Sequence, residues 1–200
     1  NGVLFLDELP EWQRHALEVL REPLESGVVT ISRAARQSEF PARFQLIAAM
    51  NPCPCGWAGD VSSRCRCSSD VITRYRARIS GPLLDRIDLH VDVPRLPPAA
   101  LRPDAPGGEP SADVAARVAS ARDRQLARAG TLNARLDQSA TTRDCRLASK
   151  DQALLERAIE ALHLSARSMH RILRVARTIA DLDGSEAIAT AHLTEALGYR

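Results

Sequence analysis

Two acidic side chains directly follow a short apolar run at the start of the sequence. Residues 3–6 are four consecutive apolar residues, and Asp7 and Glu8 come next. Such a run predicts a strand that is buried on both faces, as in a parallel sheet. Because ligands of open α/β sheets bind beyond the carboxyl ends of the strands, the acidic pair is placed where a ligand would lie.

Adjacent carboxylates can divide the work of phosphoryl transfer, since one holds Mg²⁺ and the other orients the attacking water. This is the pattern of a Walker B motif, with Asp7 as the Mg²⁺ ligand and Glu8 beside the water. The alternative is a buried strand that ends in a solvated acidic pair, because short motifs also match by chance.

A polar amide after a second apolar segment favours the first interpretation. Residues 44–50 predict a strand, and Asn51 follows it directly. Its side chain can hydrogen-bond the attacking water or a γ-phosphate oxygen. The alternative is a plain turn, because Asn-Pro is a common turn starter.

The residues between these two segments predict a helix and a basic hairpin. Apolar spacing indicates a helix over residues 11–26, which Pro23 should distort in its last turn. Residues 28–32 predict a strand that forms a hairpin with the strand over residues 44–50. Residues 33–41 would be the polar connection at its tip.

Four cysteines cluster in the loop after the second strand. They form two Cys-x-Cys pairs, Cys53 with Cys55 and Cys65 with Cys67. Four thiolates can close a tetrahedral Zn²⁺ site, although Cys-x-Cys is a tighter and less regular pair than the usual Cys-x-x-Cys. The alternative is a set of reduced thiols in a loop. The fifth cysteine, Cys145, is expected to be a small apolar residue.

Composition narrows the class of protein. The sequence has no apolar run that approaches the ~20 residues of a membrane span, and no secretory signal. Clustered cysteines suit a reducing cytosol, so we expect a cytoplasmic protein without a membrane partner. With 4% aromatic residues, stacking of bases on a row of rings is not expected. Because the sequence begins on a buried strand, we expect a piece of a longer protein.

An arginine lies just before a third predicted strand. Residues 69–79 predict an arginine-rich helix, and the alternating residues 89–93 predict a strand with one face less buried. Arg86 lies between them and could pair with Asp85 or Asp88. It could instead act as an arginine finger on the nucleotide of a neighbouring subunit.

The second half of the sequence predicts helices. A proline-rich segment over residues 95–110 indicates a linker, which divides the chain into a domain at residues 1–95, a linker at residues 96–111 and an all-helical domain at residues 112–200. Ser111 and Ser149 are expected to cap the first two helices, Ser165 to begin the third and Thr190 to cap the last. The third has an apolar face and a basic face that bears Arg167, Arg171, Arg174 and Arg177.

These elements stand in the order of an AAA+ ATPase core with its lid. The sequence resembles the magnesium-chelatase-like ComM/YifB family over nearly all 200 residues, in GVLFLDELP (2–10), AAMNPCPCG (48–56), SGPLLDRID (80–88), SAR (165–167) and RVARTIADL (174–182). The resemblance implies an α/β fold, in which the C-terminal part of a P-loop-type parallel-sheet core carries a β-hairpin insert and an all-α lid follows.

The resemblance also assigns roles and cofactors. Asp7 and Glu8 would form Walker B and hold Mg²⁺ and ATP, and Asn51 would be sensor 1. Arg86 would be the arginine finger, and Arg167 would be sensor 2. The family's Walker A loop, Gly-x-x-x-x-Gly-Lys-Ser/Thr, does not occur in these 200 residues. The chain alone is therefore expected neither to bind ATP tightly nor to hydrolyse it.

The hairpin around residues 31–43 would be the pre-sensor-1 hairpin, and its Arg33, Arg36 and Arg43 would contact DNA phosphates. Members of the family are hexameric ATP-dependent DNA helicases that promote branch migration in natural transformation. The resemblance therefore implies a homohexamer and single-stranded or branched DNA as partners. Two alternatives stay open: a magnesium-chelatase-type or protein-remodelling motor, and a non-enzymatic scaffold fragment.

Overall fold

The computed structural model describes residues 2–33, 36–60 and 63–200, and at Arg33 and Arg36 it describes the backbone alone. The chain folds into two compact units, Asn1–Ile87 and Asp88–Arg200. The first is mixed α/β and the second is helical. Within the described residues, no helix is both long and apolar enough to cross a membrane.

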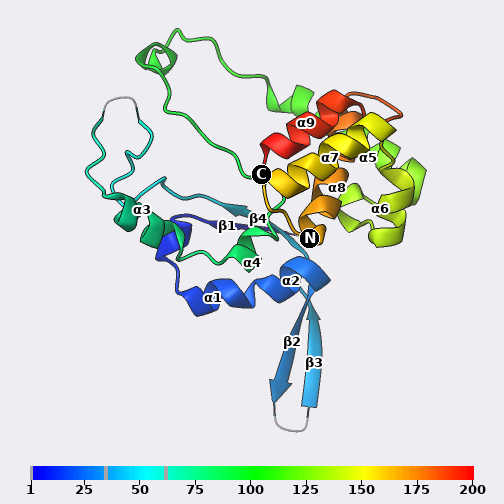
Figure 1. Ribbon diagram of the computed structural model, residues 1–200, viewed down its shortest axis with the longest axis horizontal. Helices are drawn as coiled ribbons and strands as arrows, with labels where there is room; N and C mark the ends of the chain where they lie inside the picture. Colours follow the sequence, from blue (N-terminus) through cyan, green and yellow to red (C-terminus); the bar gives the residue numbers. More distant parts are fainter. Residues whose placement is uncertain (1, 34–35, 61–62) are drawn as a thin grey trace. The chain divides into compact units, whose positions relative to one another are not determined.

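A two-stranded parallel sheet lies at the centre of the first unit. Strand β1 (Gly2–Leu6) pairs with β4 (Phe44–Ala48), and Leu6 lies opposite Ala48 at the carboxyl end. Figure 1 shows the two strands side by side. The sheet therefore joins two segments that are far apart in the sequence.

One face of this sheet packs against the core of the unit. Leu6 is 5% exposed and belongs to a cluster with Leu9, Leu17, Ile79 and Leu83. Val3 and Phe5 point to the other face and are 65% and 59% exposed. The prediction of burial on both faces is therefore wrong for the part of the chain that the structure describes. Successive side chains alternate between faces, and the cluster covers one face only.

The helix predicted after the first strand is divided into shorter pieces. They are the 3₁₀ turn η1 (Leu9–Glu11), α1 (Arg14–Val19) and α2 (Arg21–Ser26). The break lies between the two α-helices because Pro23 has no N–H to donate to the carbonyl of Val19. Gly27 ends α2 with a positive φ of 73°, which glycine adopts at little cost.

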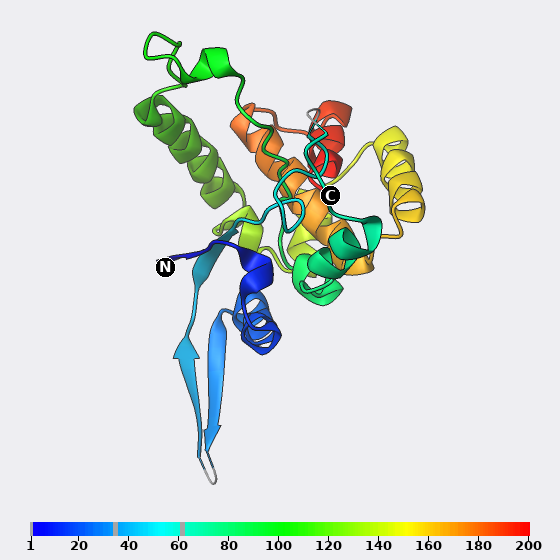
Figure 2. The same cartoon turned by 90° about the vertical axis from the view of Figure 1, so that its left-hand side faces the viewer.

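The hairpin is built from other strands than predicted. Strand β2 (Val28–Arg33) pairs antiparallel with β3 (Arg36–Pro41), and Arg33 lies opposite Arg36. The segment expected to be a polar connection is thus a strand, and β4 pairs with β1 instead. A bond from the Ala42 N–H to the Gly27 carbonyl, 2.8 Å long, closes the base of the hairpin. Figure 2 shows this ribbon extending away from the helices of its unit.

The first unit is completed by two helices behind the cysteine-containing loop. They are α3 (Ser69–Arg76) and α4 (Gly81–Leu84). The N–H of Leu83 donates to the side-chain oxygen of Ser80, 3.3 Å away, which caps α4. Leu83 of α4 and Ile79, which lies between the two helices, belong to the same cluster as Leu6 and so hold the carboxyl end of β1 in place.

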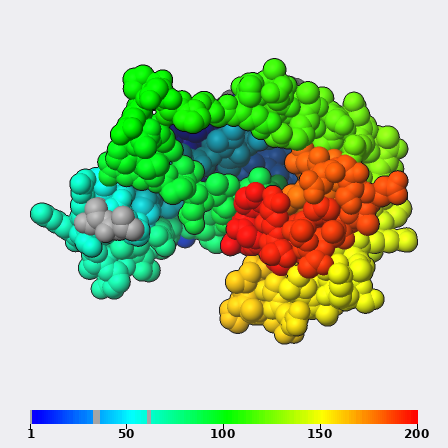
Figure 3. All heavy atoms as spheres, turned by 90° about the horizontal axis from the view of Figure 1, so that it is seen from above, coloured from blue at the N-terminus to red at the C-terminus, as the bar shows by residue number. Residues whose placement is uncertain are grey.

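The second unit is organised around one long helix. Its elements are η2 (Pro98–Leu101), α5 (Ser111–Ala129), η3 (Asn133–Arg135), α6 (Gln138–Asp144), α7 (Ser149–Ala161), α8 (Ala166–Leu182) and α9 (Thr190–Gly198). Ser165 caps α8, because its hydroxyl accepts the N–H of Ser168 at 3.2 Å. The caps predicted at Ser111, Ser149 and Thr190 are wrong, because these residues are the first of α5, α7 and α9 and follow Pro110, Ala148 and Ala189. The core is built on Ile172, Leu173, Ala176 and Ala180 of α8. Figure 3 shows α9 in red beside α7 in yellow on the surface of this unit.

The prediction of a strand over residues 89–93 is wrong. Residues 89–93 form no strand, and the side chains of Leu89, Val91 and Val93 are 48%, 62% and 85% exposed. The basic face predicted for α8 is partly buried, because Arg171 and Arg177 are 7% and 2% exposed. The Arg171 guanidinium pairs with the Asp88 carboxylate. The Arg177 guanidinium donates to the carbonyls of Glu186 and Ser185. Both buried charges therefore have hydrogen-bond partners, as buried charge requires.

Candidate functional site

The acidic pair lies at the carboxyl edge of the parallel sheet. Beyond the last paired residues, the Ala49 N–H donates to the Leu6 carbonyl and the Ala49 carbonyl accepts the N–H of Leu9, both at 2.9 Å. The chain that continues from β4 therefore runs beside Asp7 and Glu8. This is the edge at which ligands of parallel sheets bind.

The backbone holds the two carboxylates in a fixed turn. Glu8 adopts the left-handed region with φ 50° and ψ 46°, which a non-glycine residue occupies only where its surroundings impose it. Its N–H donates to a carboxylate oxygen of Asp7 at 2.8 Å, and the indole N–H of Trp12 donates to the Asp7 carbonyl at 2.9 Å. Both carboxylates are exposed, so they can meet a cation or water.

Asn51 lies on the continuation of β4 and is exposed. Its neighbour Tyr75, in α3, is 7% exposed and was not among the candidate residues. Burial raises the pKa of Tyr75, the charges of Glu11 and Glu8 raise it further, and a hydrogen bond from the Asn51 backbone lowers it. Tyr75 is thus a buried phenol that is hydrogen-bonded to the backbone of Asn51. Its only signal in the sequence is one large ring among the arginines of that helix.

A shallow surface hollow is lined by the acidic pair and four following residues, Glu11, Trp12, Gln13 and Ala16. Arg78 borders it, because its guanidinium donates to the Glu11 carboxylate at 2.9 Å and to the Pro10 carbonyl at 3.2 Å. A guanidinium therefore lies beside the three carboxylates of this hollow. The pairing joins residues 67 positions apart, which local spacing cannot reveal.

Arg86 follows α4 and lies within the first unit. Its side chain is 8% exposed and pairs with Glu25 of α2 at 2.5 Å. It also donates to the Pro82 carbonyl at 2.7 Å. Glu25 was not among the acids expected to hold this arginine. The role of Arg86 toward a neighbouring subunit stays a prediction.

The other predicted cations lie elsewhere. Arg167 is exposed in the first turn of α8, in the second unit, and its role as sensor 2 stays a prediction. Arg43 is exposed and packs against Gly27, where an added Cβ would come within 3.0 Å of it. The side chains of Arg33 and Arg36 lie outside the described residues, while their backbones face each other at the end of the hairpin.

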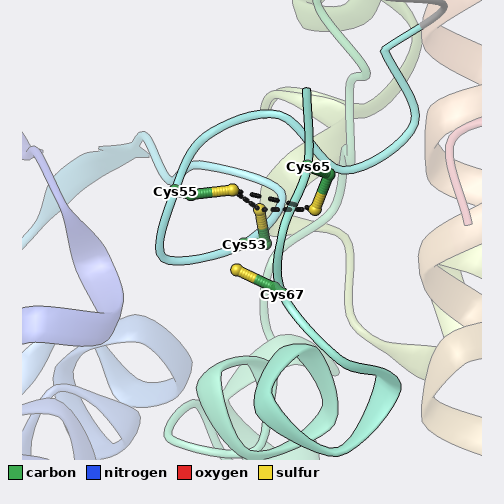
Figure 4. A group of neighbouring side chains, drawn as sticks. All are labelled: Cys53, Cys55, Cys65 and Cys67. Atoms are coloured by element: carbon green, nitrogen blue, oxygen red, sulfur yellow. Dashed lines mark hydrogen bonds between the residues drawn. The ribbon is translucent and has the colours of Figure 1, made fainter. Parts of the chain in front are cut away.

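The four loop cysteines converge on one point, although two Cys-x-Cys pairs alone did not decide this. The sulfur of Cys53 lies 3.3 Å from that of Cys55 and 3.8 Å from that of Cys65, and the last two are 3.7 Å apart. All four sulfurs, including Cys67, lie within 4.8 Å of one another. Figure 4 shows the four side chains directed toward a common centre.

The environments of the cysteines differ between the two units. Backbone N–H groups of Arg66 and Trp57 lower the pKa of the Cys55 thiol to about 6, which favours the thiolate. Cys145 lies in the second unit and is 3% exposed, and burial raises its pKa to about 11. Cys145 is therefore a small apolar core residue, as predicted. The loop cysteines do not share one shift: at Cys67 a backbone hydrogen bond lowers the pKa, but the Cys55 side chain and burial raise it by more, to about 11.

Comparison with known proteins matches both parts of the chain. Residues 1–101 match the family model "Magnesium chelatase, subunit ChlI", and residues 108–200 match "Magnesium chelatase, subunit ChlI C-terminal". "Competence protein ComM" of Haemophilus influenzae is 52% identical over 200 residues, which are all of this chain and 39% of that protein. "Uncharacterized protein YifB" of Escherichia coli is 49% identical over 201 residues, again with 100% and 39% coverage.

A protein of Mycobacterium bovis with no assigned function is 39% identical over 204 residues and matches with 100% and 40% coverage. Similarity of this kind extends across both units, so it does not depend on a single motif. The chain spans about two fifths of the length of the curated relatives it matches.

Proposed function

Because the chain belongs to the magnesium-chelatase ChlI family, we propose that it supplies the Walker B, sensor and finger residues of an AAA+ ATPase that moves DNA. The observation that carries this proposal is the placement of Asp7 and Glu8 at the carboxyl edge of a parallel sheet. The strand beside them leads to Asn51. Those three side chains are the types that phosphoryl transfer needs at such an edge.

The residues at this edge fit Mg²⁺. Mg²⁺ prefers carboxylate oxygens and keeps several waters, and the exposed Asp7 carboxylate has one oxygen fixed by the N–H of Glu8 at 2.8 Å. Asp7 would hold the ion, which neutralises charge on the phosphates. Glu8 would accept a proton from the attacking water, and Asn51 would orient that water or a phosphate oxygen.

Arg86 would act on the nucleotide of a neighbouring subunit in a ring. Its ion pair with Glu25 and its bond to the Pro82 carbonyl fix the guanidinium on its own unit. A side chain that is 8% exposed reaches a neighbour's phosphate only where that neighbour docks directly against it or where the pair with Glu25 opens. Arg167 would contact the nucleotide from the helical unit.

DNA is the proposed partner of the β2–β3 hairpin. The ribbon extends from its unit, and the backbones of Arg33 and Arg36 face each other at its end. Guanidinium groups at such a position suit phosphate contacts. One relative bears the name of a competence protein, which supports a role in DNA handling over magnesium chelation. A protein-remodelling or chelatase-type motor with the same ATP site is the second candidate.

The test is ATP turnover of the intact protein that carries this chain. Glu8→Gln should lower the rate by roughly 10²–10⁴-fold, the usual contribution of a general base, while ATP binding is retained. Glu156→Gln, the same change on the exposed side of α7, should leave the rate unchanged. Wild-type turnover in Glu8→Gln would refute the site assignment.

The partner is tested separately. Single-stranded or branched DNA should stimulate ATP turnover of the wild-type protein. Turnover that responds to a protein substrate and not to DNA would favour the remodelling motor, and a complete absence of turnover would favour a scaffold.

A further inference from the structure

We propose that Cys53, Cys55, Cys65 and Cys67 form a structural Zn²⁺ site that holds the loop after Asn51. A tetrahedral site with Zn–S bonds of about 2.3 Å places its sulfurs about 3.8 Å apart. Three sulfur–sulfur distances are 3.3, 3.8 and 3.7 Å, and all four sulfurs lie within 4.8 Å of one another. The side chains are thus arranged around a space of the size that one Zn²⁺ fills.

Other uses of four thiols fit this geometry less well. A disulfide needs sulfurs about 2.05 Å apart, and the nearest pair here is 3.3 Å apart. A catalytic zinc keeps one position for water or substrate, whereas four thiolates fill a tetrahedral shell. A site with four cysteines is therefore structural, and the buried sulfur of Cys53 also accepts the N–H of Ala58 at 3.3 Å.

The loop itself has little else to fold it. Its described residues between β4 and α3 contain no helix or strand, and Cys53 is the one residue among them that is buried. Segments without an apolar core are commonly fixed by a metal, whose binding free energy then becomes folding free energy. The Arg64 guanidinium over the Trp57 ring, 4.9 Å from its centre, is a weak contact by comparison.

The metal would fix the backbone next to Asn51. Cys53 is two residues beyond Asn51, and the intervening Pro52 carbonyl accepts from the Arg76 side chain at 3.2 Å. Zinc at one end of this short segment and α3 at the other would hold Asn51 beside Tyr75. This last consequence rests on the proposed function, whereas the metal site itself does not.

The experiment is metal analysis of the intact protein, purified without chelators, by inductively coupled plasma mass spectrometry. One zinc per chain is expected. Cys65→Ser and Cys53→Ser should lower the zinc content to background. The matched control is Cys145→Ala, which removes the remaining thiol and should keep the metal. Iron in place of zinc, no stoichiometric metal, or zinc retained in both serine variants would overturn the proposal.

A second measurement uses the wild-type protein, so it does not depend on the folding of a variant. Titration of the thiols with a mercurial should release zinc to a colorimetric indicator. Replacement by Co²⁺ should give the thiolate charge-transfer and tetrahedral ligand-field bands of a four-cysteine site. Co²⁺ spectra of an octahedral oxygen site would refute the assignment of the ligands.

Hydrogen exchange tests the role of the metal. Chelation should speed amide exchange in residues 52–60 and 63–68 by about tenfold or more, while the β2–β3 ladder serves as an internal control and does not change. Unchanged exchange in the loop would refute its dependence on zinc. A protein that binds zinc but hydrolyses no ATP would refute the proposed function and leave the metal site standing.

Discussion

Replacing Asp181 by asparagine should destabilise the helical unit by about 3 kcal/mol or more. Asp181 is 2% exposed, and both its oxygens accept from the Arg128 guanidinium at 2.7 Å. The side-chain amide of Asn133 donates to it at 2.8 Å, and Arg177 pairs with it at 3.1 Å. One buried carboxylate therefore joins α5, η3 and α8.

The magnitude follows from how far each partner can return to water. The Arg128 side chain is 25% exposed and can be resolvated, but the Arg177 side chain is 2% exposed and cannot. Arg177 keeps its bonds to the carbonyls of Ser185 and Glu186, yet it loses its counter-charge. Removing one member of a buried ion pair costs about 3–5 kcal/mol. Asparagine retains one acceptor oxygen, so the lower end applies.

The assay is chemical denaturation followed by far-ultraviolet circular dichroism, which weights the helices of the second unit. Both tryptophans, Trp12 and Trp57, lie in the first unit, so their fluorescence reports a separate transition that should not shift. Asp123→Asn, on the exposed side of α5, is the matched control. A loss below about 1 kcal/mol in Asp181→Asn, as for an exposed pair, would refute this reasoning.

The same carboxylate predicts a dependence on pH. Burial raises the pKa of Asp181, but Arg128, Asn133 and Arg177 lower it by more, so its pKa lies below the ordinary value for aspartate. A group whose pKa falls on folding stabilises the protein above its unfolded pKa of about 3.9 and loses that contribution as pH falls. The difference between wild type and Asp181→Asn should therefore shrink below about pH 4.

Three further results are expected. The double change Arg33→Ala and Arg36→Ala in the intact protein should weaken DNA binding and reduce the slope of log affinity against log salt by about 0.7–0.9 for each lost phosphate contact, while Arg122→Ala should change neither. Unaltered slope would refute the hairpin as the DNA contact. Gly27→Ala should lower the stability of the first unit by at least about 1 kcal/mol, because Gly27 has a φ of +73° and an added Cβ would lie 3.0 Å from the Arg43 side chain. Denaturation followed by tryptophan fluorescence measures this loss. Arg86→Ala should lower kcat by about 10³–10⁵-fold if it is a finger, and turnover within tenfold of wild type would exclude that role.

Local patterns predicted the elements whose stability is local. Apolar spacing placed α5, α7 and α8 close to their observed limits, and α8 begins directly after Ser165, where a helix start was predicted. The acidic pair also follows the first strand, as predicted, because a strand and the turn after it are continuous in sequence. Their position and the family of the chain support Mg²⁺ binding by Asp7 and water activation by Glu8, and both roles stay predictions.

Distant pairing explains what the sequence could not predict. The residues of β3 are mostly polar, so their sequence is typical of a loop. They form a strand because they pair with β2. Arg171 lies at helical spacing from other arginines, which predicts a basic face but does not predict its burial. Its side chain is 9% exposed, and its partner Asp88 is 83 positions away in the sequence. The convergence of the loop cysteines is likewise a property of the folded chain, because two Cys-x-Cys pairs can equally point apart.

Because the base of the β2–β3 hairpin is closed, the length of the hairpin can change without changing the positions of β1 and β4. The bond between Ala42 and Gly27 returns the chain to the point from which it left, so the ribbon can lengthen or shorten while β1 and β4 keep their register. Each added pair of residues extends the reach by about 3.3 Å. Natural variation and protein engineering can therefore alter how far this arm extends toward a partner without moving Asp7 or Asn51.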